Sequence, residues 1–291
     1  IGTDGFVNAA EVAAGLTISG SAEAGLSVSV SFGDETRTAT ADGSGAFSVS
    51  FASSVIPADG TYAVAVAPVV DSAGNESAAG ASATVVVDRT ADSDAAATLS
   101  LGASTLGAAD LESVAFTVAA LDQDATAVAR FSDGTEEVTS AVSANGAGLV
   151  DLSSLADGAV TTSLAITDEA GNTKTVTGPA LTLDSTAPAR PTLDAISGDG
   201  FVNETEAAAG LTITGTAEAG LSVSVSFGDE TRTATADDSG AFSVSFEAAA
   251  LPADGTYAVA VAPVVDGAGN ESAAGASATV VVDRTADSDA A

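Results

Sequence analysis

The stretch GLSVSVSFGDETRTATAD, residues 25–42, carries the pattern that decides the fold. Polar and apolar residues alternate before the central Gly33-Asp34 pair and alternate again after it. Period-2 alternation with β-branched and aromatic residues, broken by Gly-Asp, is typical of two strands joined by a tight turn. The same letters return unchanged at residues 220–237, so the chain repeats at least one supersecondary unit.

The repeat extends well beyond this hairpin. At a constant offset of 195 residues, 81 of the 93 residues from 4 to 96 are identical to those from 199 to 291. A diverged unit lies between the copies, because DEAGN at 168–172 matches DSAGN at 71–75. We predict three tandem domains over residues 1–90, 91–186 and 187–291. The first strand of the first domain would precede Ile1, and the third range includes the start of a following linker.

The third unit contains seven short runs with strand-like alternation, separated by turn residues, at 190–196, 210–217, 221–227, 231–237, 240–246, 256–265 and 277–283. Seven short strands at this spacing are typical of an immunoglobulin-like sandwich. We designate these runs A to G. The sequence therefore predicts an all-β chain of three tandem immunoglobulin-like β-sandwich domains in an elongated array.

The composition limits the possible functions. The chain has 7 basic and 40 acidic residues, a net charge of −33, and no His or Cys. Nucleic acids and anionic membrane surfaces repel such a chain, and no apolar run is long enough to insert into a membrane. Thiol and imidazole chemistry are excluded, so we expect that the chain is not an enzyme. We also expect the fragment to be monomeric. The abundant oxygen ligands suit calcium or magnesium.

Strand directions alternate in a sandwich, which places the acidic loops at two opposite poles. Loops A–B and E–F and the end of strand G meet at the downstream pole, which faces the following domain. Loops B–C and F–G meet the incoming linker at the upstream pole. The candidate metal ligands at the first joint are Asp4, Asn8, Glu11, Asp59, Asp88, Asp92, Asp94, Asp122, Asp124, Asp168 and Asn172. The second joint offers Asp157, Asp184, Asp266 and Asn270, and the last downstream pole offers Asp199, Asn203, Glu206, Asp254 and Asp283.

Two interpretations of these residues remain open. Two opposed carboxylates about 4 Å apart repel each other by about 1 kcal/mol in water. A calcium ion between them would attract both, and it binds about six to eight oxygen ligands, which these residues can supply. On this interpretation, each joint is loose without calcium and stiff with it. Alternatively, Asp, Asn and Gly are the usual residues of tight turns, so DSAGN and ADG form turns without any metal.

Five motifs occur in order along the first unit: DGFVNAAE from residue 4, TISGSAEAG from 17, PADGTYAV from 57, DSAGNES from 71 and VDRTAD from 87. Together they resemble the Ig-like tandem repeats of giant bacterial surface adhesins of the biofilm-associated and RTX types. The resemblance implies extracellular extender domains between a cell-surface anchor and an adhesive tip, with calcium at the junctions and neighbouring repeats as partners. Aspartates stand at 92 and 287 where such repeats have proline, which only Pro188 retains.

A second functional hypothesis is that the domains themselves bind a glycan, a host protein or a neighbouring stalk. Aromatic residues make up only 4% of the chain, which leaves few platforms on which a sugar could stack.

Overall fold

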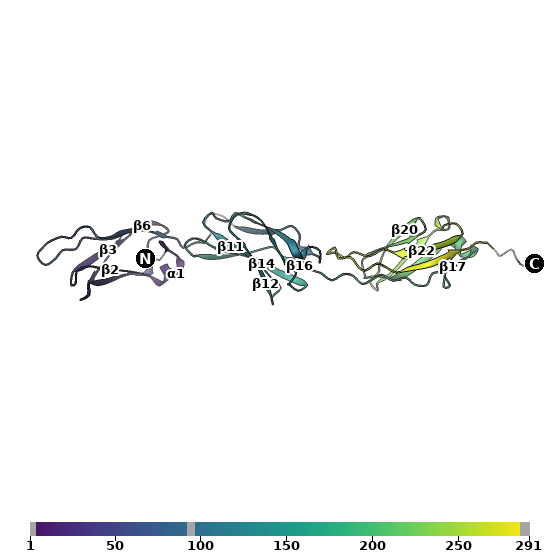
Figure 1. Cartoon of the computed structure of the whole chain (residues 1–291), viewed down its shortest axis with the longest axis horizontal. Coiled ribbons are helices and arrows are strands. Elements are labelled where there is room, and N and C mark those ends of the chain that lie inside the picture. Colours follow the sequence, from purple (N-terminus) through teal and green to yellow (C-terminus); the bar gives the residue numbers. More distant parts are fainter. Residues whose placement is uncertain (1–3, 92–96, 286–291) are drawn as a thin grey trace, which may run out of the picture.

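The computed structural model describes residues 4–91 and 97–285. Three β-sandwiches follow one another along the long axis of the molecule (Figure 1). Domain 1 contains β1 to β7, domain 2 contains β8 to β16, and domain 3 contains β17 to β23. No helix in these residues is long and apolar enough to cross a membrane.

Short strands make up each domain. Those of domain 1 are β1 (Phe6–Val7), β2 (Leu16–Ser21), β3 (Ser27–Phe32), β4 (Glu35–Thr40), β5 (Ala46–Phe51), β6 (Gly60–Val66) and β7 (Ser82–Val87). Those of domain 2 are β8 (Thr98–Leu101), β9 (Thr105–Leu106), β10 (Val114–Ala119), β11 (Thr126–Ser132), β12 (Glu137–Val142), β13 (Gly146–Val150), β14 (Gly158–Thr167), β15 (Thr173–Thr177) and β16 (Leu181–Leu183). Those of domain 3 are β17 (Phe201–Val202), β18 (Leu211–Thr216), β19 (Ser222–Phe227), β20 (Glu230–Thr235), β21 (Ala241–Phe246), β22 (Gly255–Val261) and β23 (Ser277–Val282).

The strands of each domain form two layers. The larger sheet runs β1-β7-β6-β3-β4 in domain 1 and β17-β23-β22-β19-β20 in domain 3, opposite the pairs β2-β5 and β18-β21. Domain 2 has the layers β13-β10-β8 and β12-β11-β14-β16-β9, with β15 also paired to β14. The predicted all-β fold of tandem immunoglobulin-like sandwiches is confirmed.

The fourth strand lies in the sheet that contains strands C, F and G. We labelled it D, a strand that belongs with E in constant-type immunoglobulin domains. Here β20 pairs instead with β19, and Phe227 stands opposite Glu230 across a two-residue turn. Gly228 has a φ of +60°, which glycine adopts without Cβ strain, so the tight hairpin keeps both strands in one sheet.

Proline limits two of the expected strands. The run at 190–196 forms no regular strand. The N–H groups of Thr192 and Asp194 donate to backbone carbonyl oxygens of β18 at 2.8 and 2.9 Å, and the side chains of these two residues also form hydrogen bonds to β18. The run expected over 256–265 ends at Val261. Pro191 and Pro263 have no N–H group with which to extend either ladder.

The A–B connections contain short helices that the sequence analysis did not predict. They are α1 (Ala9–Ala14) and α2 (Glu204–Ala209), and 3₁₀ turns lie at Ser53–Val55, Leu111–Ser113 and Ala248–Ala250. Each helix begins with a capping box. The Asn8 carboxamide accepts from the N–H of Ala10 and of Glu11, while the Glu11 carboxylate accepts from the N–H of Asn8.

Each domain has its own aromatic core. Phe227 lies edge-on to Phe246 and to Tyr257, with ring centroids 5.7 and 6.1 Å apart. Domain 1 repeats this packing around Phe32, and domain 2 packs Phe116 against Phe131 at 5.9 Å. Separate cores allow each sandwich to keep its shape while the joints set its direction.

The core of domain 3 gives the first testable prediction. Phe227 is fully buried, so Phe227→Ala leaves a cavity and should cost domain 3 about 3–5 kcal/mol in the free energy of unfolding. Phe201 is 53% exposed, and Phe201→Ala, the control, should cost less than about 1 kcal/mol. Urea denaturation measures both values, and equal losses would contradict the assigned core.

Candidate inter-domain joints

A turn with the pattern Asp-x-x-Gly-Asn lies at the upstream pole of each domain. We call it the Asn turn; it comprises residues 71–75, 168–172 and 266–270. In domain 2 the carboxylate of Asp168 accepts from the backbone N–H of Asn172 and from its Nδ2, both at 2.7 Å. These bonds fix the direction of the asparagine side chain.

At the first joint, the carboxamide of Asn172 contacts the backbone of domain 1. The N–H of Ala9 donates to Asn172 Oδ1 at 2.9 Å, and Asn172 Nδ2 donates to the carbonyl oxygen of Asp88 at 3.0 Å. Asn172 is 7% exposed and Asp168 is 8% exposed. The oxygen of the carboxamide and both of its N–H groups are therefore hydrogen-bonded in a buried place.

The second joint repeats this arrangement with different residues around it. The N–H of Ala108 donates to Asn270 Oδ1 at 2.8 Å, and Asn270 Nδ2 donates to the carbonyl oxygen of Asp184 at 2.6 Å. Asp266 holds the turn through two bonds of 2.9 Å. The same contact recurs although domains 1 and 2 have diverged.

The two backbone groups at each joint belong to a parallel ladder. In domain 1, β1 runs parallel to β7, and the N–H of Asp88 donates to the carbonyl oxygen of Val7 at 3.0 Å. The next bond of a parallel ladder would join the N–H of Ala9 to the carbonyl oxygen of Asp88. The carboxamide of Asn172 lies between these two groups and bonds to both.

An additional contact distinguishes the two joints. At the first joint, Asn8 Nδ2 donates to the carbonyl oxygen of Ala170 at 3.0 Å. Gly107 occupies the corresponding position at the second joint, where a Cβ atom would stand 2.5 Å from the carbonyl oxygen of Ala268. The first joint therefore has a side-chain bond where the second has a close backbone approach.

Several predicted metal ligands are held within their own domain. Asp59 forms an ion pair with Arg89 at 2.6 Å, and Asp254 forms the equivalent pair with Arg284 at 3.2 Å. In domain 2, Asp157 accepts from Ser185 N and from Thr186 Oγ1. Each of these bonds ties the E–F loop to the segment that leaves the domain.

The other candidates mostly stabilise local turns or caps. Bonds to a backbone N–H one to three residues away are made by Asp4, Asp122, Asp184, Asp199 and Asp283, and by the capping pairs Asn8 with Glu11 and Asn203 with Glu206. Asp92 and Asp94 lie outside the described residues. Metal ligation by these side chains stays a prediction.

Asp88 stands out by its electrostatic environment. Burial raises the pKa of its carboxyl group. A hydrogen bond from the N–H of Thr90 at 3.1 Å opposes this, and the negative charges of Asp168, Asp59 and Asp124 add to it, so the pKa lies above its usual value. Arg89 does not neutralise this charge, because its guanidinium is bound to Asp59 and to the carbonyl oxygens of Ile56 and Pro57. The structure thus places the Asp88 carboxylate where three other predicted ligands repel it.

Within residues 4–91 and 97–285, no group of three or more acidic side chains converges tightly enough to hold a metal ion. The raised pKa of Asp88 shows that its negative charge is disfavoured, and its carboxylate oxygens are of the kind that calcium prefers. Of the residues predicted to hold such an ion at this joint, Asp88 and Asp124 lie within the described part of the chain, whereas Asp92 and Asp94 do not.

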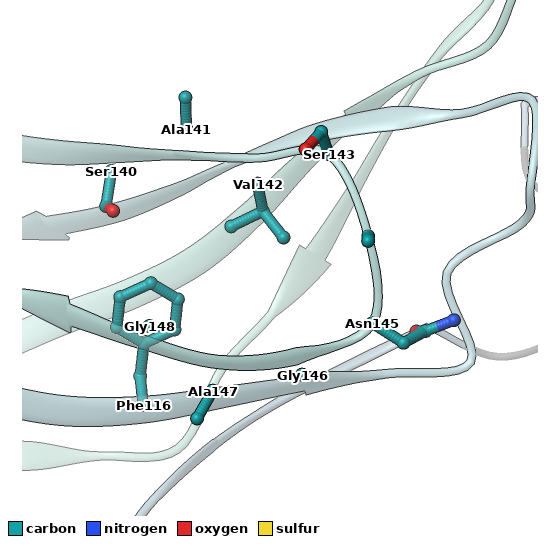
Figure 2. Close-up of a pocket in the computed structure, with 10 residues that line it drawn as sticks. Phe116, Ser140, Ala141, Val142, Ser143, Asn145, Gly146, Ala147 and Gly148 are labelled. Carbon is teal, nitrogen blue, oxygen red and sulfur yellow. The ribbon is translucent and has the colours of Figure 1, made fainter.

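Domain 2 also contains a surface hollow of about 270 Å³ between β12 and β13. Figure 2 shows the ring of Phe116 beside Gly148 and places Asn145 at the bend between the two strands. Asn145 exchanges hydrogen bonds with the backbone of Leu121, and no ionisable side chain lines the hollow. This lining supplies no acid–base or metal chemistry.

The sequence analysis did not predict the contacts at the joints that are made by backbone groups or that depend on a glycine. Ala9 and Ala108 contribute an N–H group, which every residue except proline has, so no sequence pattern marks them. The sequence gives a weak indication of the close approach at Gly107, because this glycine replaces the asparagine found at the equivalent positions 8 and 203. The capping boxes could have been found from the spacing Asn-x-x-Glu.

The raised pKa of Asp88 gives the first joint a pH dependence of definite sign. The folded chain binds this proton more tightly than the unfolded chain, where aspartate titrates near 3.8, so stability falls as the pH rises through the interval above 3.8. Without calcium at neutral pH, Asp88→Asn should raise the stability of domain 1 by at most about 0.5 kcal/mol, because partly exposed charges are screened. Calorimetry across this pH range measures the change.

The matched control for Asp88→Asn is Asp283→Asn at the same position of domain 3, which has no Asp124 or Asp168 beside it. A loss of stability in Asp88→Asn at neutral pH, or the same gain in both variants, would contradict the inferred repulsion.

Comparison with known proteins identifies the family. The model of the bacterial Ig-like domain matches residues 91–185, and that of the bacterial Ig domain matches residues 187–283. Among curated proteins, none matches.

Among solved structures, a Ca²⁺-stabilized, ice-binding adhesin of an Antarctic bacterium is 30% identical over 98% of this chain and 73% of that chain, with a TM-score of 0.49. A 1.5-MDa bacterial ice-binding adhesin is 27% identical over 97% of this chain and 95% of that one, with a TM-score of 0.44. An immunoglobulin-like domain of the M. primoryensis ice-binding adhesin is 32% identical over 34% of this chain and all of its own length, with a TM-score of 0.28.

The two family models cover domains 2 and 3, and domain 1 is a close copy of domain 3. The chain belongs to the bacterial immunoglobulin-like domains, here arranged in tandem.

Proposed function

We propose that this chain is an extender segment of a bacterial cell-surface adhesin. Its domains, over residues 1–90, 91–186 and 187–291, would hold an adhesive tip at a fixed distance outside the cell, for attachment and biofilm formation. Calcium at the joints would stiffen the array; the matched adhesin of an Antarctic bacterium is described as Ca²⁺-stabilized.

The end-to-end docking of the domains carries this proposal. Each joint links the downstream pole of one sandwich to the upstream pole of the next through the same asparagine contact. Contacts at opposite poles add the length of one domain at each step, which gives the extended array in Figure 1. This geometry suits a spacer, because the domains meet only at their poles and the faces of the sandwiches take no part in the joints.

The near-identity of domains 1 and 3 also supports a spacer. Their sequences agree at 81 of 93 aligned positions, so neither carries a large insertion that would form a separate binding site. The net charge of −33 favours repulsion between neighbouring stalks.

The calcium component of the proposal concerns the first joint. Asp88 and Asp124 would hold the ion together with Asp92 and Asp94, and the ion would supply the positive charge that offsets their repulsion. The chain's own contribution is to place Asp88 partly buried beside other carboxylates, so that binding a cation relieves an existing unfavourable interaction.

Replacing Asp88, Asp92 and Asp94 together by Asn tests the calcium component. Calorimetric titration of the full chain should show weaker calcium binding, and small-angle scattering should show a smaller calcium-induced gain in stiffness, because the charged ligands at the first joint are lost.

The equivalent triple substitution at Asp283, Asp287 and Asp289 is the matched control, since it removes the same charges outside both joints. Calcium binding that falls equally in both variants would place the ion elsewhere. A wild-type scattering profile that is unchanged between calcium and chelator would contradict calcium stiffening, and a compact profile in both conditions would contradict the extender.

A further inference from the structure

We propose that the Asn turn is a metal-independent clamp, in which the carboxamides of Asn172 and Asn270 fix the direction of each domain on the one before it. As a statement about the stiffness of an extender, this inference rests on the proposed function. Its physical basis is separate, because the clamp consists of neutral hydrogen bonds between protein groups.

The chemistry of the side chain fits the place that it occupies. The downstream pole presents one donor, the N–H of Ala9, and one acceptor, the carbonyl oxygen of Asp88. A carboxamide offers an acceptor and a donor side by side, which is the same pair that a peptide group offers. A carboxylate at position 172 would place an acceptor opposite the carbonyl of Asp88, so asparagine cannot be replaced by aspartate without losing a bond.

The Asn turn has its shape before it meets a partner. In domain 1, Asp71 bonds to the N–H and to Nδ2 of Asn75, both at 2.8 Å, as Asp168 does in domain 2. Yet Asn75 is exposed, and no domain precedes it within the described residues. The turn is therefore preorganised by its own aspartate, and docking does not have to create it.

The receiving pole is also preformed. In domain 3 the ladder of β17 and β23 ends with the N–H of Asp283 bonded to the carbonyl oxygen of Val202. A hollow of about 410 Å³ follows, lined by residues 203–206 and 283–285. The corresponding residues of domain 1 include Asn8, Ala9 and Asp88, which hold the turn of domain 2. Domain 3 therefore presents the same docking surface to an Asn turn of a further domain of this family.

Removing the carboxamide of Asn172 gives the direct test. Asn172→Ala loses both bonds to domain 1, which should raise the ratio of undocked to docked conformers about ten-fold. Spin labels on Thr38→Cys in domain 1 and Thr139→Cys in domain 2 report this as a broader distance distribution, measured in chelator on the full chain. The chain has no cysteine of its own, so the labels are specific.

Asn75→Ala is the matched control, because it loses the same bonds within its turn and none to another domain. Asn172→Asp, which keeps the size of the side chain, should broaden the distribution as Asn172→Ala does. The clamp is overturned if the wild type is already broad in chelator, if both Asn172 variants keep its width, or if Asn75→Ala broadens equally. If calcium then narrowed the distance distribution of the wild type, that result would still support the calcium-stiffened extender.

The close approach at Gly107 gives an independent test at the second joint. In Gly107→Ala the new Cβ would stand 2.5 Å from the carbonyl oxygen of Ala268 and 3.0 Å from Asn270 Oδ1, so domain 3 has to move away. Labels on Thr139→Cys and Thr233→Cys should show a distribution as broad as that of Asn270→Ala. Gly102→Ala is the control, because its Cβ would meet nothing within 4 Å. An unchanged distribution in Gly107→Ala would contradict the docked geometry.

Discussion

A single carboxamide placed between two backbone groups determines how one domain follows another. At each of the two joints, a parallel pair of strands ends with an N–H and a carbonyl group that do not bond to each other. The side chain of Asn172 or Asn270 bonds to both groups and so continues the ladder across the domain boundary. Because hydrogen bonds are directional, this contact specifies an orientation as well as an attachment.

The neutral clamp and the charged cluster lie next to each other at the first joint. Asp88 contributes its carbonyl oxygen to the clamp and its carboxylate to the repulsive group. Asp168 likewise holds Asn172 and adds negative charge beside Asp88. Mutations that remove a carboxylate can therefore change both systems, which is why asparagine substitutions are more informative than alanine ones at these aspartates.

The sequence was sufficient to predict the tandem sandwiches and to place the turns that contain Asn172 and Asn270 at the joints. Alternation in the 220–237 stretch located β19 and β20 closely, since the strands have a buried and an exposed face. It could not assign β20 to a sheet, because the pairing follows from the geometry of the turn at Gly228.

The sequence predicted where the candidate site lies, at the joints, but it did not predict the hydrogen bonds to backbone groups that form there. Asn172 and Asn270 were expected at the joints as metal ligands, and the structure places them there in contact with backbone groups. Backbone partners such as the N–H of Ala9 have no side-chain signature. The N-caps at Asn8 and Asn203 were missed because acidic and amide residues near a turn also fit a metal site.

Residual dipolar couplings of the full chain, measured by NMR in chelator, test the central claim most directly. If the Asn clamp fixes each domain on its neighbour, the couplings of all three domains should fit one alignment tensor without calcium. Three different tensors, each weaker than that of a rigid array, would show that the domains reorient freely and that the hydrogen bonds of Asn172 and Asn270 do not hold the joints.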